Sequence, residues 1–186
     1  LLRFRVKFAN EEFPVELALE GQHYVPDALA AIGVGLALGV DSKNIRQSLA
    51  HFRNMAGRQE VFEANGYTII RDCYNAGPES MAAALNVLGK KSGRRIAVLG
   101  DMLELGEETE KLHRFVGEYT ENRVDVLVTY GKFSEYINDS SVVNEKYHYN
   151  TENREQLKQF LSDLIQEGDV VLYKASNGMK LFDLIV

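Results

Sequence analysis

The chain has few cysteines, no clustered histidines and no long apolar runs, and each shortage excludes a class of protein. Cys73 is the only cysteine among 186 residues, so no intrachain disulfide can form. The four histidines lie far apart in the sequence, without the spacing of metal ligands. We therefore expect a cytoplasmic protein with no metal site of its own.

Membrane spans and basic clusters are missing as well. The longest apolar run, 28–40, contains three glycines and is shorter than the roughly 20 residues that a membrane span needs. The net charge is -6, and the 21 Lys and Arg residues are scattered along the chain. An acidic chain without a basic patch is a poor partner for a phosphate backbone, so we expect neither a membrane span nor a nucleic-acid partner.

Two fingerprints of nucleotide binding are also absent. No G-x-G-x-x-G follows the first predicted strand, which argues against a dinucleotide site of the NAD type. No G-x-x-x-x-G-K-[ST] loop is present, so the chain alone cannot hold the β- and γ-phosphates of ATP in the P-loop manner. If ATP is the ligand, this chain holds only part of its site. Because it begins at Leu1 without a Met, we expect a piece of a longer protein.

The pattern of apolar residues predicts two regions that differ in architecture. Residues 2–8 and 13–19 alternate in polarity like the strands of a hairpin, and two helices are expected at about 26–38 and 42–52. Apolar periodicity lapses between Asn54 and Gly57, where we place a domain boundary.

From Arg58 onward, predicted strands alternate with predicted helices. Strands are expected at 60–64, 67–72, 95–100, 124–130, 146–149 and 169–174, and helices at 78–90, 108–121, 133–138, 152–166 and 179–185. This alternation predicts an α/β fold with a doubly wound, mostly parallel sheet.

The most informative segment is the end of the predicted strand 67–72. The strand ends in Asp72, a turn follows, and Pro78 suits the first position of the next helix. Open parallel sheets bind ligands beyond the carboxyl ends of their strands, so Asp72 and Asn75 are candidates for contact with a nucleotide. The alternative is that both residues only cap the turn. Cys73 has no histidine close in sequence to activate it, and we expect it to be buried.

Several ordered motifs together resemble one family over nearly the whole chain, the Mur ligases of peptidoglycan synthesis. They read GR at 57–58, DCYNAGPESM at 72–81, AVLGDMLELG at 97–106 and KASNGM at 174–179. Members of this family have an N-terminal domain for the UDP-sugar peptide, a central ATPase domain with a P-loop, and a Rossmann-like C-terminal domain. ATP phosphorylates a substrate carboxylate, and an amine then attacks the acyl phosphate.

The resemblance carries expectations for domains, activity and partners. Residues 1–55 match the last part of the central domain, and residues 56–186 match the Rossmann-like C-terminal domain. The sequence motifs most resemble those of members that join D-alanyl-D-alanine to UDP-N-acetylmuramoyl-tripeptide. We expect a monomer whose ATP and Mg²⁺ are held mainly by a segment before Leu1, so that this chain alone is inactive. Alternatives are a Mur or folylpolyglutamate-type ligase for another substrate, or a non-catalytic Rossmann-like binding module.

The resemblance also assigns roles to single residues on the nucleotide side. Arg58 matches the catalytic family arginine that reaches the ATP phosphates, a task suited to a permanently charged, forked guanidinium; a surface ion pair is the alternative. Asp72 matches the acid that hydrogen-bonds the ribose, and Asn75 a polar position near the phosphates. Gly77 stands where the family usually has Asn.

Two further groups of candidates follow from the same resemblance. The segment 21–27 aligns with a G-x-H-N-x-x-N motif that holds the adenine, but Tyr24 and Asp27 replace the asparagines. Tyr24 can stack on a base, and Asp27 can accept from its amine or cap the following helix. The candidates for the second substrate lie in loops after strands: Asp101, Met102, Tyr130, Lys174, Ser176, Gly178 and Met179. The last motif of the family is not fully kept in this chain, which departs from it at Ala175, Asn177 and Phe182.

Overall fold

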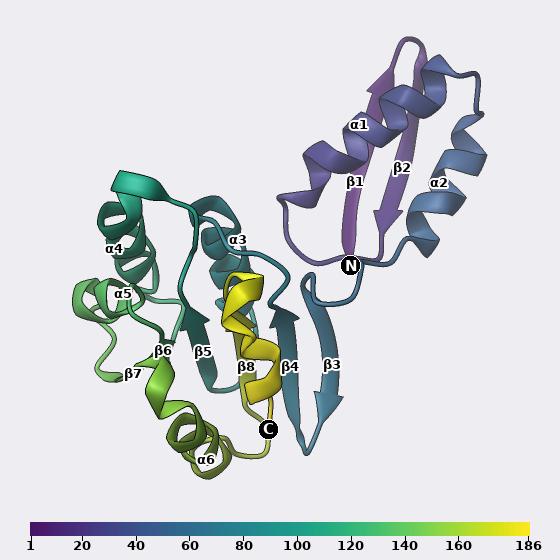
Figure 1. The fold of residues 1–186 in the computed structure, drawn as a ribbon. Helices are drawn as coiled ribbons and strands as arrows, with labels where there is room; N and C mark the ends of the chain where they lie inside the picture. The colour runs from purple at the N-terminus through teal and green to yellow at the C-terminus, as the bar shows by residue number, and fades with distance from the viewer. The chain divides into compact units, whose positions relative to one another are not determined.

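The computed structural model describes residues 1–186, which divide into two compact units, Leu1–Asn54 and Met55–Val186 (Figure 1). Each unit has a hydrophobic core of its own. None of the helices combines the length and the apolar character that crossing a membrane would require.

The first unit is a hairpin covered by two helices. Strands β1 (Leu2–Phe8) and β2 (Glu11–Leu17) pair antiparallel, with Val6 opposite Phe13. Their alternating polarity turns one face inward, against α1 (Tyr24–Ala37) and α2 (Ser42–His51). The buried members of this core are Val6, Phe13, Val15, Ile32 and Ile45. The predicted hairpin and helix pair are therefore present, with β2 beginning and ending two residues earlier than expected.

The second unit is built on one six-stranded sheet with the order β3-β4-β8-β5-β6-β7. Its strands are β3 (Glu60–Ala64), β4 (Tyr67–Asp72), β5 (Arg95–Gly100), β6 (Val126–Tyr130), β7 (Glu145–Tyr149) and β8 (Val170–Lys174). The pairings from β4 to β7 are all parallel, which confirms the predicted mostly parallel α/β sheet.

The edge strand β3 is the antiparallel exception. Only Asn65 and Gly66 separate it from β4, and both have positive φ, 52° and 82°. A two-residue Asn-Gly loop of this kind forms a tight hairpin, whereas a parallel crossover needs a dozen or more residues.

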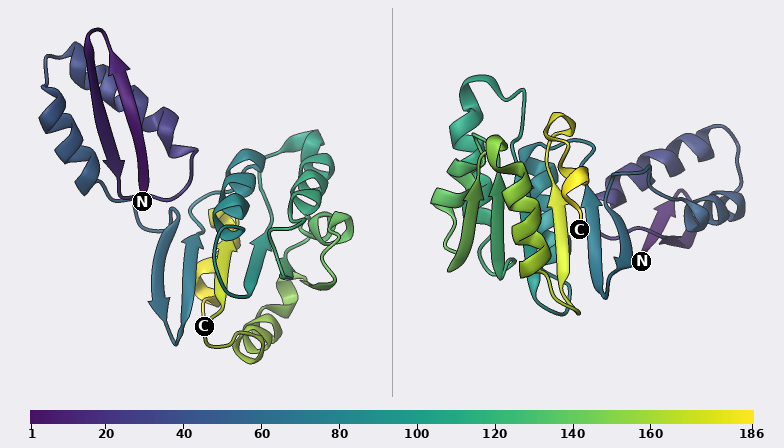
Figure 2. Two further views of the ribbon diagram at one scale, coloured as in Figure 1. Left: turned by 180° about the vertical axis from the view of Figure 1, so that it is seen from behind. Right: turned by 60° about the horizontal axis from the view of Figure 1, so that its bottom comes forward.

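Helices cover both faces of the sheet. Helices α3 (Pro78–Leu88), α4 (Thr109–Tyr119) and α5 (Glu135–Ser140) bury their apolar side chains in one core, and α6 (Arg154–Leu164) lies in the other. Three successive crossovers move the chain in the same direction across the sheet, and the return from β7 to β8 reverses it. Crossovers of one handedness therefore place α6 opposite the other three helices, as the views from the front (Figure 1) and from behind (Figure 2, left) show.

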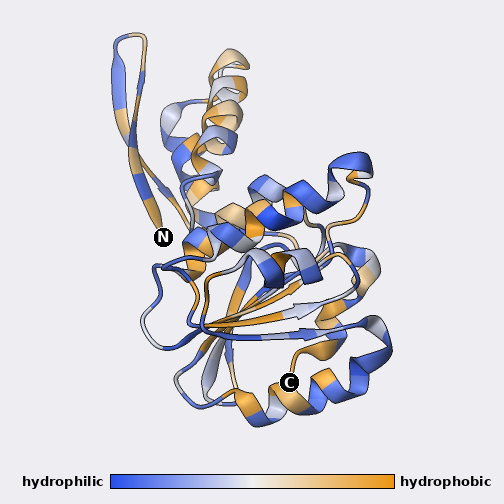
Figure 3. Cartoon of the chain, turned by 90° about the vertical axis from the view of Figure 1, so that its left-hand side faces the viewer, coloured by the Kyte–Doolittle hydropathy of each residue, from blue (hydrophilic) through white to orange (hydrophobic).

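The central strands are hydrophobic on both sides because both faces of the sheet are covered. All five residues of β8 are buried, as are all five of β6. Figure 3 shows hydrophobic segments among the strands of the sheet, whereas the helices around them carry many hydrophilic positions.

The last predicted helix, 179–185, is absent. Two short 3₁₀ helices, Asn177–Met179 and Leu181–Leu184, take its place and are separated by Lys180 at φ 49°. A non-glycine residue in the left-handed region interrupts an α-helix, and the turn at Lys180 instead buries Leu181 and Leu184 against the α6 side of the sheet.

Candidate functional site

Three neighbouring strands end at the same edge of the sheet. In the parallel register, Asp72 of β4 lies beside Lys174 of β8, and Lys174 lies beside Leu99 of β5. The loops that follow these strands therefore begin next to one another, although they are far apart in the sequence. This carboxyl edge is where doubly wound sheets bind ligands.

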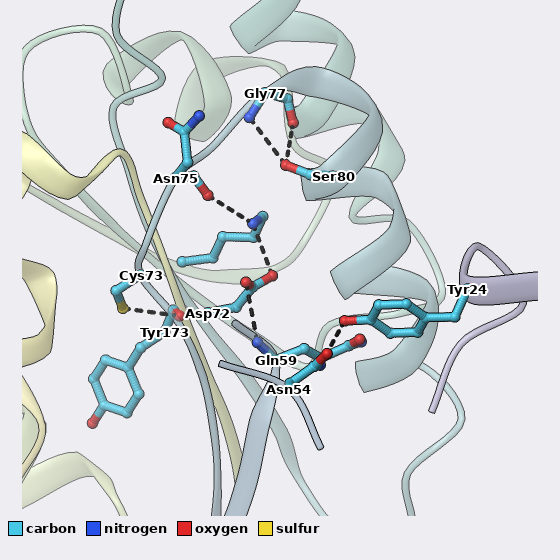
Figure 4. Close-up of polar contacts among 10 residues, drawn as sticks. Tyr24, Asn54, Gln59, Asp72, Cys73, Asn75, Gly77, Ser80 and Tyr173 are labelled. Atoms are coloured by element: carbon cyan, nitrogen blue, oxygen red, sulfur yellow. Dashed lines mark hydrogen bonds and ion pairs between the residues drawn. The ribbon is translucent and has the colours of Figure 1, made fainter. Parts of the chain in front are cut away.

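A buried ion pair occupies the centre of this edge. Lys174 Nζ donates to Asp72 Oδ2 at 2.8 Å and to the Asn75 carbonyl oxygen at 3.0 Å. Asp72 Oδ1 accepts the backbone N–H of Gln59 at 3.2 Å (Figure 4). An ionised carboxylate has about four lone-pair sites, so Asp72 keeps capacity for further donors. Gln59 is buried, at 8% exposure, and neither the nitrogen nor the oxygen of its side-chain amide has a hydrogen-bond partner.

The Gly57–Gln59 loop lies against the end of β4. The Tyr74 N–H donates to the Gly57 carbonyl at 3.1 Å. The guanidinium carbon of the exposed Arg58 lies 4.1 Å from the centroid of the Tyr74 ring. Gly57 and Gln59 both have positive φ, 75° and 44°, so Arg58 stands between two left-handed residues. The structure thus brings Arg58, Asp72 and Asn75, predicted separately as nucleotide contacts, to neighbouring positions of one edge.

Asp101 fixes the loop after β6. Its Oδ1 accepts the backbone N–H groups of Phe133 at 3.0 Å and Ser134 at 2.7 Å, and its Oδ2 accepts that of Lys132 at 3.1 Å. Gly131 has φ 125°, and a Cβ there would lie 2.4 Å from Asp101 Oδ1. The carboxylate of Asp101 is buried and serves this loop.

Met102 is fully buried and its backbone is held by a histidine. The Met102 N–H donates to His113 Nε2 at 3.0 Å, and His113 Nδ1 lies 2.6 Å from the Thr109 carbonyl. These contacts assign the proton of a neutral imidazole to Nδ1. Burial holds the pKa of His113 below its ordinary value, although the Thr109 carbonyl and the charge of Asp101 oppose that shift. No role was predicted for His113.

The other candidates for the second substrate are distributed between interior and surface. Ser176 is buried, and its Oγ accepts the Leu103 N–H at 2.9 Å. Tyr130 is buried too, and its hydroxyl accepts from Arg154 at 3.3 Å. Gly178 is exposed and Met179 half-buried. Of the predicted set, these last two therefore offer the most accessible surface.

Tyr24 and Asp27 belong to the first unit. The Tyr24 hydroxyl accepts from Asn54 Nδ2 at 2.7 Å, and its ring centroid lies 4.2 Å from that of His23. Asp27 is exposed in the first turn of α1, whose N-cap position is His23. The alternative that Asp27 caps this helix is therefore wrong, because α1 begins three residues before it.

Cys73 is an inert buried residue. Its thiol donates to the Tyr173 carbonyl, with the sulfur 3.2 Å from the oxygen. Burial, followed by the negative charge of Asp72, raises its pKa to about 12. The expected burial is confirmed, and a thiol with a pKa raised in this way carries little thiolate at neutral pH, which argues against a nucleophilic role.

A small cavity of about 200 Å³ lies beside the Arg58 loop. It is lined by Ala56, Gly57, Arg71, Cys73, Tyr74, Asn177 and Phe182. The cavity therefore lies between the end of β4 and the segment after β8, on the side of the sheet that α6 covers. No group of three or more His, Cys, Asp or Glu side chains is arranged to hold a metal ion.

Comparison with known proteins gives one consistent result. The family described as Mur ligase, glutamate ligase domain, matches residues 57–177. The UDP-N-acetylmuramoyl-tripeptide–D-alanyl-D-alanine ligase of Bacillus subtilis is 33% identical over 189 residues, which cover 98% of this chain and 41% of that protein.

Solved structures agree. MurF from Acinetobacter baumannii has a TM-score of 0.87 and 27% identity, with 98% of this chain and 40% of that one covered. The MurF ligase from Thermotoga maritima in complex with ADP has a TM-score of 0.77 and 29% identity, with 93% and 39% covered. The chain thus spans about two fifths of the length of the relatives it matches.

Proposed function

The chain belongs to the Mur ligase family, and from that premise we propose that it is the C-terminal part of a cytoplasmic, ATP-dependent ligase that joins D-alanyl-D-alanine to UDP-N-acetylmuramoyl-tripeptide. The observation that carries the proposal is the shared edge of the sheet, where Arg58, Asp72 and Asn75 meet. The similarity to ligases of this substrate pair, over nearly the whole chain, supports the specificity.

In this proposal, the two units belong to different domains of the full-length protein. Met55–Val186 is the Rossmann-like C-terminal domain, and Leu1–Asn54 is the last part of the central ATP-binding domain. The surface of α1 supports the second assignment, since this helix is largely hydrophobic along its length (Figure 3). Leu29, Val34 and Leu38 are 45%, 61% and 78% exposed. A soluble domain usually covers an apolar face of this kind with further chain.

The residues at the edge of the sheet fit part of an ATP site. Asp72 has free accepting capacity for ribose hydroxyls, and the Gln59 amide next to it is buried without a partner. No hydrogen bond or ion pair within the chain engages the Arg58 guanidinium, so its N–H groups are available to phosphate oxygens. ATP would supply the phosphoryl group that activates the carboxylate. Its phosphates and Mg²⁺ would be held mainly by residues outside this chain.

The second substrate would approach the loops after β5, β6 and β8. Gly178, which is exposed, and Met179, which is half-buried, are the most accessible members of the predicted set, and the remaining predicted residues shape the loops from inside. Asp101 ties the loop after β6 to the end of β5. Ser176 ties the segment after β8 to Leu103. The predicted set would then act chiefly by fixing the shape of a dipeptide site.

The proposal is tested with the full-length protein that carries this chain. We expect phosphate release only when ATP, UDP-N-acetylmuramoyl-tripeptide and D-alanyl-D-alanine are all present, with the ligated product seen by mass spectrometry. The 186-residue chain alone is the control and should release none, because it has no P-loop. Turnover with a single amino acid in place of the dipeptide would assign the chain to another ligase of the family. Absence of turnover with every acceptor would favour a non-catalytic module.

A further inference from the structure

The Arg58 side chain has one contact that orients it. Its guanidinium lies over the Tyr74 ring, 4.1 Å from the centroid, and no hydrogen bond or ion pair engages its N–H groups. An exposed arginine loses side-chain rotamer entropy when it is fixed in one position. A face-on aromatic contact lowers that loss in advance. It also leaves the N–H groups at the edge of the guanidinium available for phosphate oxygens.

The Tyr74 ring is itself held in place relative to Arg58. The Tyr74 N–H donates to the carbonyl of Gly57, and the Gln59 N–H donates to Asp72. These two hydrogen bonds lie on either side of the Arg58–Tyr74 contact, so they link the loop to the strand end twice. The left-handed backbone at Gly57 and Gln59 is held by the same bonds.

The tyrosine has no structural task that would explain it otherwise. Tyr74 is 47% exposed, although neighbouring Cys73 and Ala76 are buried. The structure provides no hydrogen-bond partner for its hydroxyl. Besides its share in the lining of the small cavity, the contact of its ring with Arg58 is therefore the interaction that this side chain makes.

We propose that Tyr74 is a positioning residue for Arg58, which holds the guanidinium ready for the phosphates of the bound nucleotide. This inference rests on the proposed function, because it takes the role of Arg58 from it. It adds that the ribose contact at Asp72 and the phosphate contact at Arg58 are mechanically linked through the segment Asp72–Tyr74.

The first test measures the contact itself in the 186-residue chain. The Arg58 Nε–H resonance in a ¹H–¹⁵N NMR spectrum should be shifted by the ring current of Tyr74. Tyr74→Leu should move this resonance toward its random-coil position, and Tyr74→Phe, which keeps the ring, should leave it near the wild-type position. Unchanged resonances elsewhere in the spectrum would confirm that both variants fold. An Arg58 resonance that is the same in Tyr74→Leu and wild type would overturn the proposal.

The second test measures single-turnover ADP formation in the full-length protein with the tripeptide precursor bound. Tyr74→Leu should slow this step about twofold to fivefold, the range expected for one exposed cation–π contact, with nucleotide affinity unchanged. Tyr74→Phe should restore the rate. In an Arg58→Ala background, Tyr74→Leu should cause no further loss.

The outcomes separate the two proposals. If Arg58→Ala leaves ADP formation unchanged, the proposed role of Arg58 fails and the inference fails with it. If Arg58→Ala slows the step but Tyr74→Leu does not, only the positioning role of Tyr74 is wrong. A raised KM for the dipeptide with an unchanged rate of ADP formation in Tyr74→Leu would mean that Tyr74 contacts the second substrate, which also overturns the inference.

Discussion

Lys174 and Asp72 form an ion pair across two adjacent parallel strands, with Nζ 2.8 Å from Oδ2 and side chains that are 2% and 16% exposed. The sequence predicted the two residues for different ligands, Asp72 for a ribose and Lys174 for the second substrate. In the structure each one satisfies the other's charge. The ammonium also holds the Asn75 carbonyl, so one lysine ties the last residue of β4 to the turn that follows it.

Lys174→Met should destabilise the second unit by about 3 kcal/mol, because removal of one partner from a buried pair leaves the other charge uncompensated. Urea unfolding followed by circular dichroism measures this change. The double variant Lys174→Met/Asp72→Asn should recover part of the loss. As a matched control, Lys111→Met breaks an exposed helical pair with Glu108 and should barely change stability. A double variant that is less stable than Lys174→Met would show that the pair does not couple the two strands.

His113 should make stability depend on pH. Burial lowers its pKa in the folded state below the value near 6.5 of the unfolded chain. Below about pH 6.5 the unfolded state therefore binds more protons, so the contribution of His113 to stability is fully present above that pH and is lost as the pH falls through the folded pKa. Thermal unfolding should be measured between pH 5 and pH 8. As the pH is lowered, the melting temperature should fall more steeply for wild type than for His113→Gln, which cannot take up a proton. Parallel curves would assign the pH dependence to other groups.

Cys73 should be unreactive in the folded chain. Its side chain is buried and its pKa is raised to about 12, so both access and thiolate are lacking. Reaction with a chromogenic disulfide reagent should release almost no thiolate under native conditions and one equivalent in guanidinium chloride. Rapid stoichiometric reaction of the native chain would mean that the end of β4 opens readily.

Gly131→Ala should be among the most damaging single substitutions. A methyl group at φ 125° would overlap the Asp101 carboxylate, so the loop after β6 has to move and its three N–H contacts weaken. We expect a loss of roughly 3 kcal/mol from overpacking and backbone strain together. Gly77→Ala is the control, since a Cβ there meets nothing within 4 Å. Equal unfolding midpoints for the two variants would contradict the role given to Asp101.

Local signals in the sequence were sufficient for most of the elements, although not for the segment 179–185. Alternating polarity identified the hairpin and the strands, and helical spacing identified the main helices, because each depends on residues close in the chain. Asp72 at a strand end, followed by Pro78 at a helix start, correctly predicted where β4 ends and α3 begins. The Asn-Gly turn before β4 was also a local signal, and it predicts the antiparallel β3 that the strand pattern alone did not.

Tertiary structure decided which of these residues meet. Strand β8 inserts between β4 and β5, and that pairing of distant segments places Lys174 against Asp72. The carboxylate of Asp101 faces backbone N–H groups more than 30 residues away for the same reason. Periodicity records which face of an element is buried, but not which strand becomes its neighbour. The partners of buried polar groups therefore depend on strand order and register, which exist only once the sheet has formed.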